Sequence, residues 1–404
     1  MPPVRAPFQP TAMPSSFKVA LLIETSNRYG RDLLYGVRDW LQQRGERWSI
    51  RFTEQSRRAP LPSWLGDWQG DGIIARVDSP QIATALKRAK IPVVDVSADR
   101  PKSAFPRVSI DNESVSRLAV AHLKDKGLQD IAFIGDRRFV WSRQREDEFR
   151  HIMEKAGKPC RIYKTPSVDN AHLGSDSELR GIVRWLKNLP RPIGIFACYD
   201  NRALQVLEAC QLSGFSVPDE VAVLGVDDDE VLCQLCNPPL TSVLPNARLT
   251  GYEAAAMLSR MMHGEHLASQ TRYIEPIRVV ERQSTDATAV NDPKIAAAVR
   301  FINEHACEGI DVSDVLRAVP VSRTLFDRRF KTWLGHSPHQ HITNKRIERA
   351  KQLLFDSDLA ITVIAELAGF LTASYLSTVF NRETGMTPYA YRMKLRTNRV
   401  GSRP

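Results

Sequence analysis

Cysteine is scarce in this chain. Its 404 residues include 6 Cys, and only Cys233 and Cys236 form a CxxC pair. No second pair and no histidine stand at the spacing of a zinc site, so the sequence predicts no metal, and the two thiols are interpreted as structural. Scattered free thiols favour a reducing, cytoplasmic compartment.

Long hydrophobic runs are also missing. Residues 1–16 are rich in proline and have no apolar core of the kind that a signal peptide requires, and the apolar run at 19–23 is too short to span a membrane. These absences predict a protein that stays inside the cell and has no membrane partner.

Motifs for nucleotide cofactors and for catalysis are absent too. No GxGxxG follows the first predicted strand, no GxxxxGKS/T occurs, and no glycosidase signature is present. No general acid–base histidine accompanies the candidate carboxylates Asp200 and Asp227. We therefore predict neither a catalytic residue nor a cofactor.

Positive charge, by contrast, is concentrated near the C-terminus. Residues 290–404 contain 17 Lys and Arg against 11 Asp and Glu, which gives +6 of the chain's net charge of +10. A basic segment of this kind suits a polyanionic partner, and a solvated basic surface is the alternative interpretation.

Strands and helices alternate along residues 17–285, and a last strand is predicted at 273–285. Apolar runs typical of buried parallel strands are separated by segments with helical spacing of apolar residues, which predicts a parallel α/β sheet covered on both faces. The number of strands indicates two lobes. We expect a disordered tail at 1–16, the two-lobed α/β domain at 17–285, a linker at 286–294 and an all-α domain at 295–404.

Two segments of the all-α domain share one pattern. In the first, Val312 and Val315 form an apolar face, and after a turn Ser322 is placed to cap a second helix. In the second, Ile364 belongs to the apolar face and Gly369 supplies a turn residue that can adopt a positive φ. Each pattern predicts a helix-turn-helix, whose second helix offers polar residues on its outer face.

We call these second helices, within 322–335 and 372–385, the first and second recognition helices. Residues 341–354 between the two motifs predict a rigid connecting helix. A helix of ~20 residues is about 30 Å long, close to the ~34 Å between successive major-groove faces of B-DNA. One chain can therefore place two recognition helices in adjacent turns of a duplex.

Fixed spacings across the all-α domain resemble those of the AraC-type DNA-binding domain. The residues that carry the resemblance are Gly335, Pro338, Arg346, Ala350, Leu353, Leu354, Ile361, Ile364, Ala365, Gly369, Phe370, Ser374, Tyr375, Phe380, Gly385, Thr387, Pro388, Tyr391 and Arg392. The chain departs from the family at Asn381, where Lys or Arg is usual, and at Leu371 and Ala373, which make the second recognition helix less polar.

The resemblance implies double-stranded DNA as a partner and assigns roles to individual side chains. In the first recognition helix, Arg328, Thr324 and Asp327 match positions that reach base edges, and a guanidinium such as that of Arg328 can pair bidentately with guanine. Arg323 and Lys331 match phosphate contacts. In the second recognition helix the candidates are Thr372, Ser374, Ser377 and Thr378 for bases and Arg382 for the backbone. The alternative for each is a solvated helix residue.

The α/β domain resembles the LacI-type, periplasmic sugar-binding fold, in which ligand binds between two lobes joined by three crossovers. The stretches VSIDN, GVDDDE, PPLTSV and VVERQST carry this resemblance. The N-terminal helix-turn-helix of LacI-type proteins is absent, because the first strand begins near Phe17. A sugar-binding core followed by an AraC-type domain resembles the bacterial xylose operon regulators over essentially the whole chain.

A sugar site needs carboxylates or amides for the hydroxyl groups, an Arg to fix them and an aromatic ring for the apolar sugar face. Asp227 and Asp200 end predicted parallel strands, where ligands of α/β proteins bind. Arg145 matches the sugar-binding Arg of the family, and Trp141 is placed to cover the sugar ring. Further candidates are Ser26, Asn27 and Asp111. Asp228, Asp229 and Glu230 are interpreted as an exposed helix start.

We expect a sugar-responsive transcriptional regulator that acts as a homodimer. The resemblance implies a pentose of the xylose type as effector, activation rather than repression, and RNA polymerase as a possible partner. Three alternatives stay open: a DNA-binding regulator whose α/β domain has lost its ligand and serves for dimerisation, an enzyme acting on a sugar or nucleotide, and a transport-type solute-binding protein.

Overall fold

The computed structural model describes residues 16–52, 62–97, 104–165, 175–286 and 292–393. The chain divides into two compact units. Unit 1 comprises Met1–Ser109 and Ala247–Arg272, and unit 2 comprises Ile110–Asn246 and Tyr273–Pro404. The predicted tail, up to residue 15, and residues 287–291 of the predicted linker lie outside the described residues.

Unit 1 is built around a six-stranded sheet with the order β11-β5-β4-β3-β1-β2, and its neighbours from β5 to β2 pair in parallel. Its strands are β1 (Phe17–Leu22), β2 (Trp48–Phe52), β3 (Gly72–Ala75), β4 (Val93–Asp95), β5 (Arg107–Ile110) and β11 (Thr271–Ile274). Its helices are α1 (Arg28–Arg44), η1 (Ser63–Asp67), α2 (Pro80–Ala89) and α8 (Ala247–Met262).

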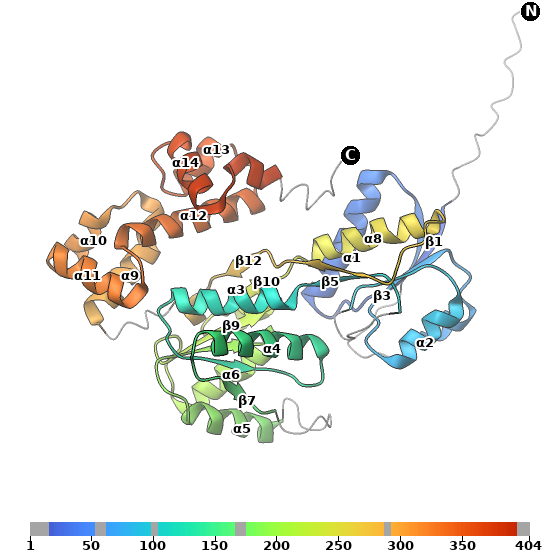
Figure 1. Cartoon of the computed structure of the whole chain (residues 1–404), viewed down its shortest axis with the longest axis horizontal. Helices are drawn as coiled ribbons and strands as arrows, with labels where there is room; N and C mark the ends of the chain where they lie inside the picture. The colour runs from blue at the N-terminus through green and yellow to red at the C-terminus, as the bar shows by residue number, and fades with distance from the viewer. Residues whose placement is uncertain (1–15, 53–61, 98–103, 166–174, 287–291, 394–404) are drawn as a thin grey trace, which may run out of the picture. The chain divides into compact units, whose positions relative to one another are not determined.

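Helices α1 and α8 lie side by side in unit 1 (Figure 1). A Cβ atom on Gly36 would lie 1.9 Å from the carbonyl oxygen of Arg248, and one on Gly251 would lie 1.9 Å from that of Leu33. Only glycine permits this close crossing of two backbones. Helix α2 and η1 pack on a separate apolar cluster that includes Ile73 and Leu86.

The sheet of unit 2 also has six strands, in the order β12-β10-β9-β8-β6-β7. Its strands are β6 (Ile131–Ile134), β7 (Arg161–Tyr163), β8 (Ile193–Ala197), β9 (Val221–Val226), β10 (Thr241–Leu244) and β12 (Arg278–Val280). Helices α3 (Asn112–Asp125) and α4 (Val140–Lys155) pack together, as do α5 (Asp176–Lys187) and α6 (Asp200–Ser213). The short helix α7 (Glu230–Leu235) follows β9.

The last predicted strand was wrong in one respect. The stretch predicted as one strand at 273–285 belongs to two strands, β11 in the first sheet and β12 in the second, and it ends in the short η3 helix (Gln283–Thr285). Pro276 lies between the two strands. Because proline has no N–H to donate to a sheet ladder, the chain leaves one sheet there before it joins the other.

The C-terminal part of unit 2 is entirely helical within the described residues. Its elements are α9 (Pro293–His305), η4 (Ala306–Glu308), α10 (Val312–Ala318), α11 (Arg323–Leu334), α12 (Pro338–Asp356), α13 (Ile361–Leu367) and α14 (Ala373–Thr384). Helix α9 begins at Pro293 with Asp292 as its N-cap, inside the predicted linker. The pairs α10–α11 and α13–α14 are the two predicted helix-turn-helix motifs, so the predicted fold class is confirmed.

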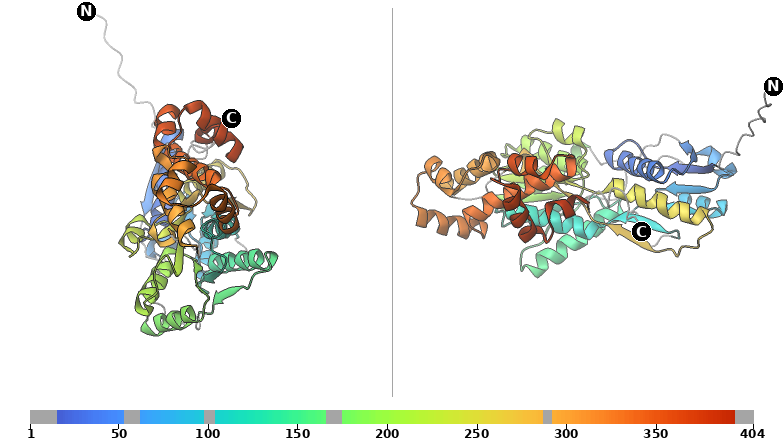
Figure 2. Two further views of the ribbon diagram at one scale, coloured as in Figure 1. Left: turned by 90° about the vertical axis from the view of Figure 1, so that its left-hand side faces the viewer. Right: turned by 90° about the horizontal axis from the view of Figure 1, so that it is seen from above.

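Helix α12 takes part in two separate hydrophobic cores. Ile342 packs with α9, α10 and α11 around Phe326 and Phe330, whereas Ile347 and the residues after it pack with α13 and α14 around Phe380. The two motifs therefore sit towards opposite ends of one continuous helix (Figure 2). None of the helices in the described part of the chain combines the length and the apolar character that a bilayer crossing requires.

Candidate ligand site and DNA interface

The loop after β9 has an unusual backbone. Every residue of β9 is buried, and the two residues that follow, Asp227 and Asp228, have φ angles of 109° and 48°. Positive φ is rare for residues other than glycine, and consecutive examples persist only where the surroundings hold them. Such strain is often found at ligand sites, which fits the prediction of Asp227 as a ligand residue.

Asp200, the first residue of α6, fixes this loop by hydrogen bonds. Its Oδ2 atom accepts a hydrogen bond from the Asp229 N–H (2.8 Å), and its Oδ1 accepts one from the Ser242 hydroxyl (2.6 Å). The Ser242 oxygen in turn accepts from the Asp228 N–H (3.0 Å). Burial, together with the negative charge of Asp227, raises the pKa of Asp200 well above its usual range. Through these hydrogen bonds Asp200 fixes the backbone of the loop that follows β9. The predicted contact between Asp200 and a ligand stays a prediction.

Arg145, on α4, is buried beside the end of β8. Its Nε donates to Asn112 Oδ1 (2.9 Å), its Nη1 donates to the Cys198 carbonyl, and its guanidinium lies 4.8 Å from the centre of the Trp141 ring. The predicted residues Arg145 and Trp141 are thus in direct contact. Asn112 was not predicted as a site residue, although it lies in the stretch VSIDN.

Trp141 is the centre of an aromatic cluster. Its ring stacks on Phe139 at 4.9 Å and meets the edge of Tyr199 at 5.6 Å. Tyr199 directly precedes Asp200, so the segment after β8 contacts both the arginine and the loop after β9. Four predicted residues, Arg145, Trp141, Asp200 and Asp227, therefore gather around the carboxyl ends of β8 and β9, as expected for an α/β ligand site.

The remaining predicted ligand residues lie at helix starts. Asp111 is the N-cap of α3, and its carboxylate accepts from the N–H groups of Glu113 (3.0 Å) and Ser114 (3.1 Å). In unit 1, Asn27 is the N-cap of α1, and the exposed Ser26 precedes it after β1. Capping accounts for Asp111 and Asn27, so their contact with a ligand stays a prediction.

Asp228 differs from the predicted exposed helix start. Its side chain is buried and forms an ion pair with Arg282, whose Nη2 lies 2.8 Å from Asp228 Oδ1. Arg282 follows β12, one strand beyond β10 in the same sheet, so the sheet brings the two charges together. Glu230 is exposed, as predicted, and Asp229 is half-buried at the start of α7.

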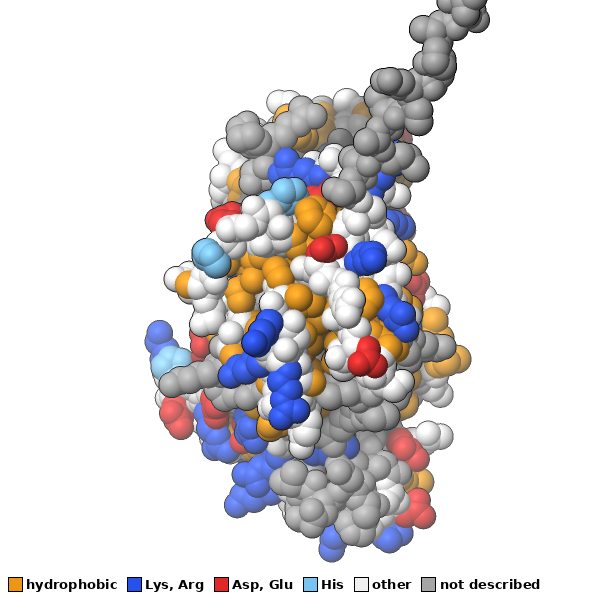
Figure 3. All heavy atoms as spheres, turned by 90° about the vertical axis from the view of Figure 1, so that its right-hand side faces the viewer, with side chains coloured by type: hydrophobic (Ala, Val, Ile, Leu, Met, Phe, Trp, Pro, Cys, Tyr) orange, Lys and Arg blue, Asp and Glu red, His pale blue; other side chains and the backbone are white. Residues whose placement is uncertain are grey.

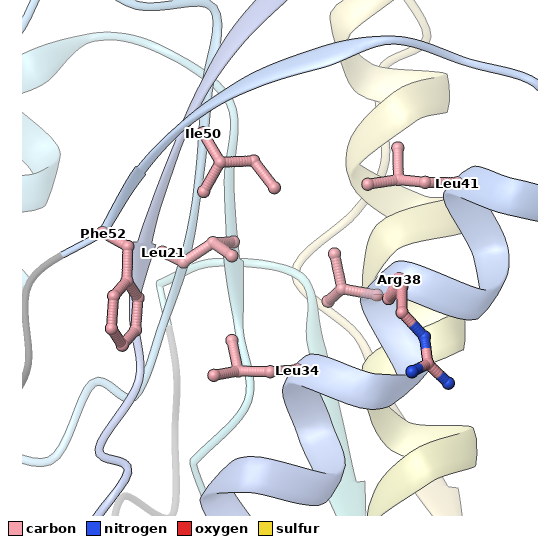
Figure 4. A pocket seen from close by; sticks show the side chains of 7 residues that line it. Leu21, Leu34, Arg38, Leu41, Ile50 and Phe52 are labelled. Atoms are coloured by element: carbon pink, nitrogen blue, oxygen red, sulfur yellow. The ribbon is translucent and has the colours of Figure 1, made fainter.

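A pocket of about 270 Å³ lies in unit 1, between α1 and β2 (Figure 4). Apolar side chains from Leu21, Leu34, Ile50 and Phe52 line it together with Arg38. None of the described residues that line it is a carboxylate or an amide, the side chains that accept hydrogen bonds from sugar hydroxyls. A separate feature is visible on the molecular surface. On the face shown in Figure 3, hydrophobic side chains lie next to one another among scattered Lys and Arg side chains.

The CxxC cysteines are buried. Burial raises the pKa of Cys236 to about 11 and raises that of Cys233 further, with the negative charge of Asp200 adding to both shifts. Thiols held protonated in this way are poor nucleophiles and poor metal ligands. Within the described ranges, no three His, Cys, Asp or Glu side chains are grouped so that they can hold a metal ion.

The first recognition helix, α11, presents its predicted contacts to solvent. Thr324, Arg328 and Lys331 are exposed, and Arg323 forms an i,i+4 ion pair with Asp327 at 3.2 Å. The opposite face carries the fully buried rings of the first helical core. This division into a buried apolar face and an exposed polar one is what major-groove reading requires.

The second recognition helix, α14, has a sparser polar face. Thr372 is its N-cap and accepts from the Tyr375 N–H (3.1 Å), Ser374 and Thr378 are exposed, and Ser377 is half-buried. Arg382 is exposed near the end of the helix and contacts Glu383 (2.9 Å). Helix α12, with 19 residues, has a length of about 28 Å. The structure thus provides two recognition helices, α11 and α14, joined by α12, for contact with one face of a DNA duplex.

Comparison with protein families divides the chain in the same way. Residues 18–112 match the XylR N-terminal domain, residues 120–285 match a periplasmic binding protein-like domain, and residues 315–394 match a helix-turn-helix domain.

Relatives match along nearly the whole chain. It is 33% identical over 382 residues to the xylose operon regulatory protein of Escherichia coli (strain K12), covering 93% of this chain and 96% of that protein. The protein of the same name from Haemophilus influenzae is 33% identical over 384 residues, covering 93% and 98%.

Solved structures agree with this assignment. A structure described as the xylose-binding transcription activator xylR superposes with a TM-score of 0.62 and 31% identity over 94% of this chain and 98% of that one. The cellobiose complex of the transcriptional regulator CelR shares the fold, with a TM-score of 0.53 and 24% identity over 66% of this chain and 84% of that one. The chain therefore belongs to the family of the bacterial xylose operon regulators, DNA-binding transcriptional regulators in which a XylR-type, periplasmic-binding-protein-like domain precedes an AraC-type helix-turn-helix domain.

Proposed function

We propose that this chain binds a pentose, with xylose as the first candidate, and that the bound sugar changes how its two recognition helices engage operator DNA. The contact between Arg145 and Trp141 beside the strained Asp227 loop supports this proposal most directly. It joins a fixed guanidinium, an aromatic cluster and a carboxylate, which together match the chemistry of vicinal sugar hydroxyls. The names of the relatives supply xylose.

The residues have different roles in this proposal. Asp227 accepts hydrogen bonds from sugar hydroxyls, and Arg145 donates to them. Trp141 covers the apolar face of the sugar ring, and its packing against Phe139 and under Arg145 also orients the guanidinium. The half-buried Tyr199, at the edge of Trp141, adds a second ring next to the sugar. Asp200 fixes the loop that carries Asp227. Ser26 and Asn27, in unit 1, and Asp111, in unit 2, are proposed as further ligand-binding residues.

At the DNA, Arg328, Thr324 and Asp327 read bases from the first recognition helix, while Arg323 and Lys331 bind phosphates. Ser374, Ser377 and Thr378, with Thr372 at the cap, read from the second helix, and Arg382 binds the backbone. We propose further that the protein acts as a homodimer in the cytoplasm, activates a pentose catabolic operon through contact with RNA polymerase, and carries out no catalytic step.

A thermal-shift screen against a panel of pentoses and hexoses, followed by calorimetric titration, tests the ligand. We expect xylose or a close stereoisomer to raise the melting temperature of the wild type. Arg145→Lys should lose that shift, because lysine cannot reproduce the planar fork that binds Asn112, Cys198 and the ligand together. Arg150→Lys, at an exposed arginine further along α4, is the matched control. No shift with any sugar would instead favour a domain kept for dimerisation.

A further inference from the structure

Two neighbouring residues after β12, Glu281 and Arg282, are bound to different parts of unit 2. Arg282 belongs to the candidate ligand site: besides its ion pair with Asp228, its Nη1 donates to the Leu240 carbonyl (2.9 Å) and its N–H donates to Thr241 Oγ1 (2.9 Å). The loop that carries Asp227 is therefore fastened to the first residues after Glu281.

Glu281 belongs to the boundary with the DNA-binding helices. Its two carboxylate oxygens accept hydrogen bonds from Lys345 Nζ on α12, at 3.1 and 3.0 Å. Lys126, the C-cap of α3, donates to the same carboxylate at 2.8 Å, and His122 Nδ1 lies 3.6 Å away. Glu281 thus joins α12 of the DNA-binding domain to the sugar-binding lobe.

Lys345 is held tightly in this position. Its side chain is 15% exposed, and it also reaches Glu348 at 3.1 Å. Burial alone would lower the pKa of Lys345, but the negative charges of Glu281 and Glu348 outweigh burial and raise it. A largely buried charge of this kind depends on its partners, because removal of one partner leaves the other ion without compensation.

The position of Lys345 along α12 places its contact with Glu281 between the two helix-turn-helix motifs. It lies between Ile342, which packs in the core of the first helix-turn-helix, and Ile347, which packs in the core of the second. A displacement of α12 at Lys345 therefore moves both recognition helices together.

We propose that the contacts Asp228–Arg282 and Glu281–Lys345 form a coupling element that links occupation of the sugar site to the position of α12. A sugar bound at Asp227 changes the geometry of the adjacent Asp228, Arg282 follows it, and the neighbouring Glu281 shifts Lys345 and α12. This inference rests on the proposed function, since it requires a sugar at Asp227. A ligand can shift DNA affinity only through such differential contacts in two states.

The experiment compares the affinity of the full chain for DNA with and without saturating xylose. The DNA is a duplex that the wild type selects from random sequence, and binding is followed by fluorescence anisotropy. The ratio of the two dissociation constants is the coupling factor. Calorimetry gives the xylose affinity of each variant, and circular dichroism verifies its fold.

Glu281→Gln and Lys345→Met should each reduce the coupling factor at least about fivefold, the lower end of typical coupling, while xylose affinity stays within about twofold. The double variant should lose no more than either single variant, because both changes break one contact. Lys345→Arg, which keeps the charge, should retain most of the coupling. Glu148→Gln, an acid of the same lobe paired with Arg117, is the matched control and should behave as wild type.

Unchanged coupling in folded Glu281→Gln and Lys345→Met, with xylose still bound, would overturn the coupling element and leave the proposed function intact. A wild type that binds selected DNA but neither xylose nor any other sugar of the panel would overturn the proposed function and, with it, this inference. If Glu281→Gln does not fold, Lys345→Met decides alone, because its neutral side chain has a similar length.

Discussion

Asp200 and Gly225 are in direct contact, with no room between them for a side chain. A Cβ atom on Gly225 would lie 2.3 Å from Asp200 Oδ1 and 3.2 Å from Leu240 Cδ2. Gly225 is the fifth residue of β9, two positions before Asp227. Asp200 can therefore hold the loop after β9 only because position 225 has no side chain.

Gly225→Ala should therefore displace the Asp200 carboxylate and release the hydrogen bonds from Ser242 and Asp229. We expect unit 2 to lose about 1–3 kcal/mol of stability, as for other overpacked cores, and xylose affinity to fall with it. Chemical denaturation and calorimetry measure the two effects. Gly66→Ala, where the added Cβ has no contact within 4 Å among the described residues, is the control and should change neither. A fully stable Gly225→Ala protein with unchanged xylose binding would contradict the role given to Asp200.

Asp227→Asn tests the carboxylate that faces the proposed sugar. Asparagine tolerates the positive φ of this position, so the fold should persist while the charged acceptor is lost. We expect xylose affinity to fall at least tenfold, or about 1.4 kcal/mol, with basal DNA binding unchanged. Glu230→Gln, an exposed acid of the same segment, serves as control. Equal affinities in Asp227→Asn and the wild type would remove Asp227 from the site.

Arg328→Ala tests base reading by the first recognition helix. The exposed guanidinium is expected to pair with one guanine, so its removal should cost about 1–3 kcal/mol on the selected duplex and relax preference at one base position. Lys331→Ala should instead weaken binding to all sequences and reduce the salt dependence by about one charge. Competition binding with single-base variants of the duplex separates the two patterns. A uniform loss for Arg328→Ala would assign that residue to phosphate.

His122→Gln tests the effect of acid on unit 2. Burial, with the charges of Lys126 and Lys345 adding to it, lowers the pKa of His122 to about 3, against an ordinary value of 6.5. Between these values the unfolded chain binds a proton that the folded chain does not. We therefore expect the stability of unit 2 to fall as the pH drops below 6.5, by about 2 kcal/mol at pH 5.

The glutamine variant can keep the hydrogen bond that His122 Nε2 makes with Thr285 Oγ1 (2.9 Å), but it has no proton to gain. We expect its loss of stability between pH 7.5 and pH 5 to be smaller than that of the wild type by about this amount, measured by urea unfolding. His151→Gln, at an exposed position on α4, is the control. The same acid sensitivity in all three proteins would show that His122 is protonated in the folded state.

Local patterns in the sequence were sufficient for most of the fold. Apolar strands followed by amphipathic helices predicted both sheets, and Gly369, with a φ of 75°, occupies the left-handed turn expected between α13 and α14. Arg145 was predicted from the family resemblance and Trp141 as an aromatic residue for the sugar face, and the two lie in contact. Local patterns specify whether a segment forms a strand or a helix, and at which end of a strand a residue lies.

The missed features depend on contacts between distant parts of the chain. The burial of Asp228 requires Arg282, 54 positions later in the sequence, whereas the local pattern of Asp228, Asp229 and Glu230 is that of a solvated helix start. Asn112 on α3 contacts Arg145 on α4. Glu281, after β12, contacts Lys345 only once α12 packs against the α/β part of unit 2. Neither composition nor periodicity carries information about such pairings.

The continuity of α12 through both helical cores fixes the angular phase between the two recognition helices. One residue inserted between Ile342 and Ile347 would rotate one motif against the other by about 100° and advance it by about 1.5 Å. On the proposed function, we therefore expect the two operator segments that these helices contact to keep a constant spacing. Operators that differ by one base pair in that spacing should be discriminated even where every contacted base is the same.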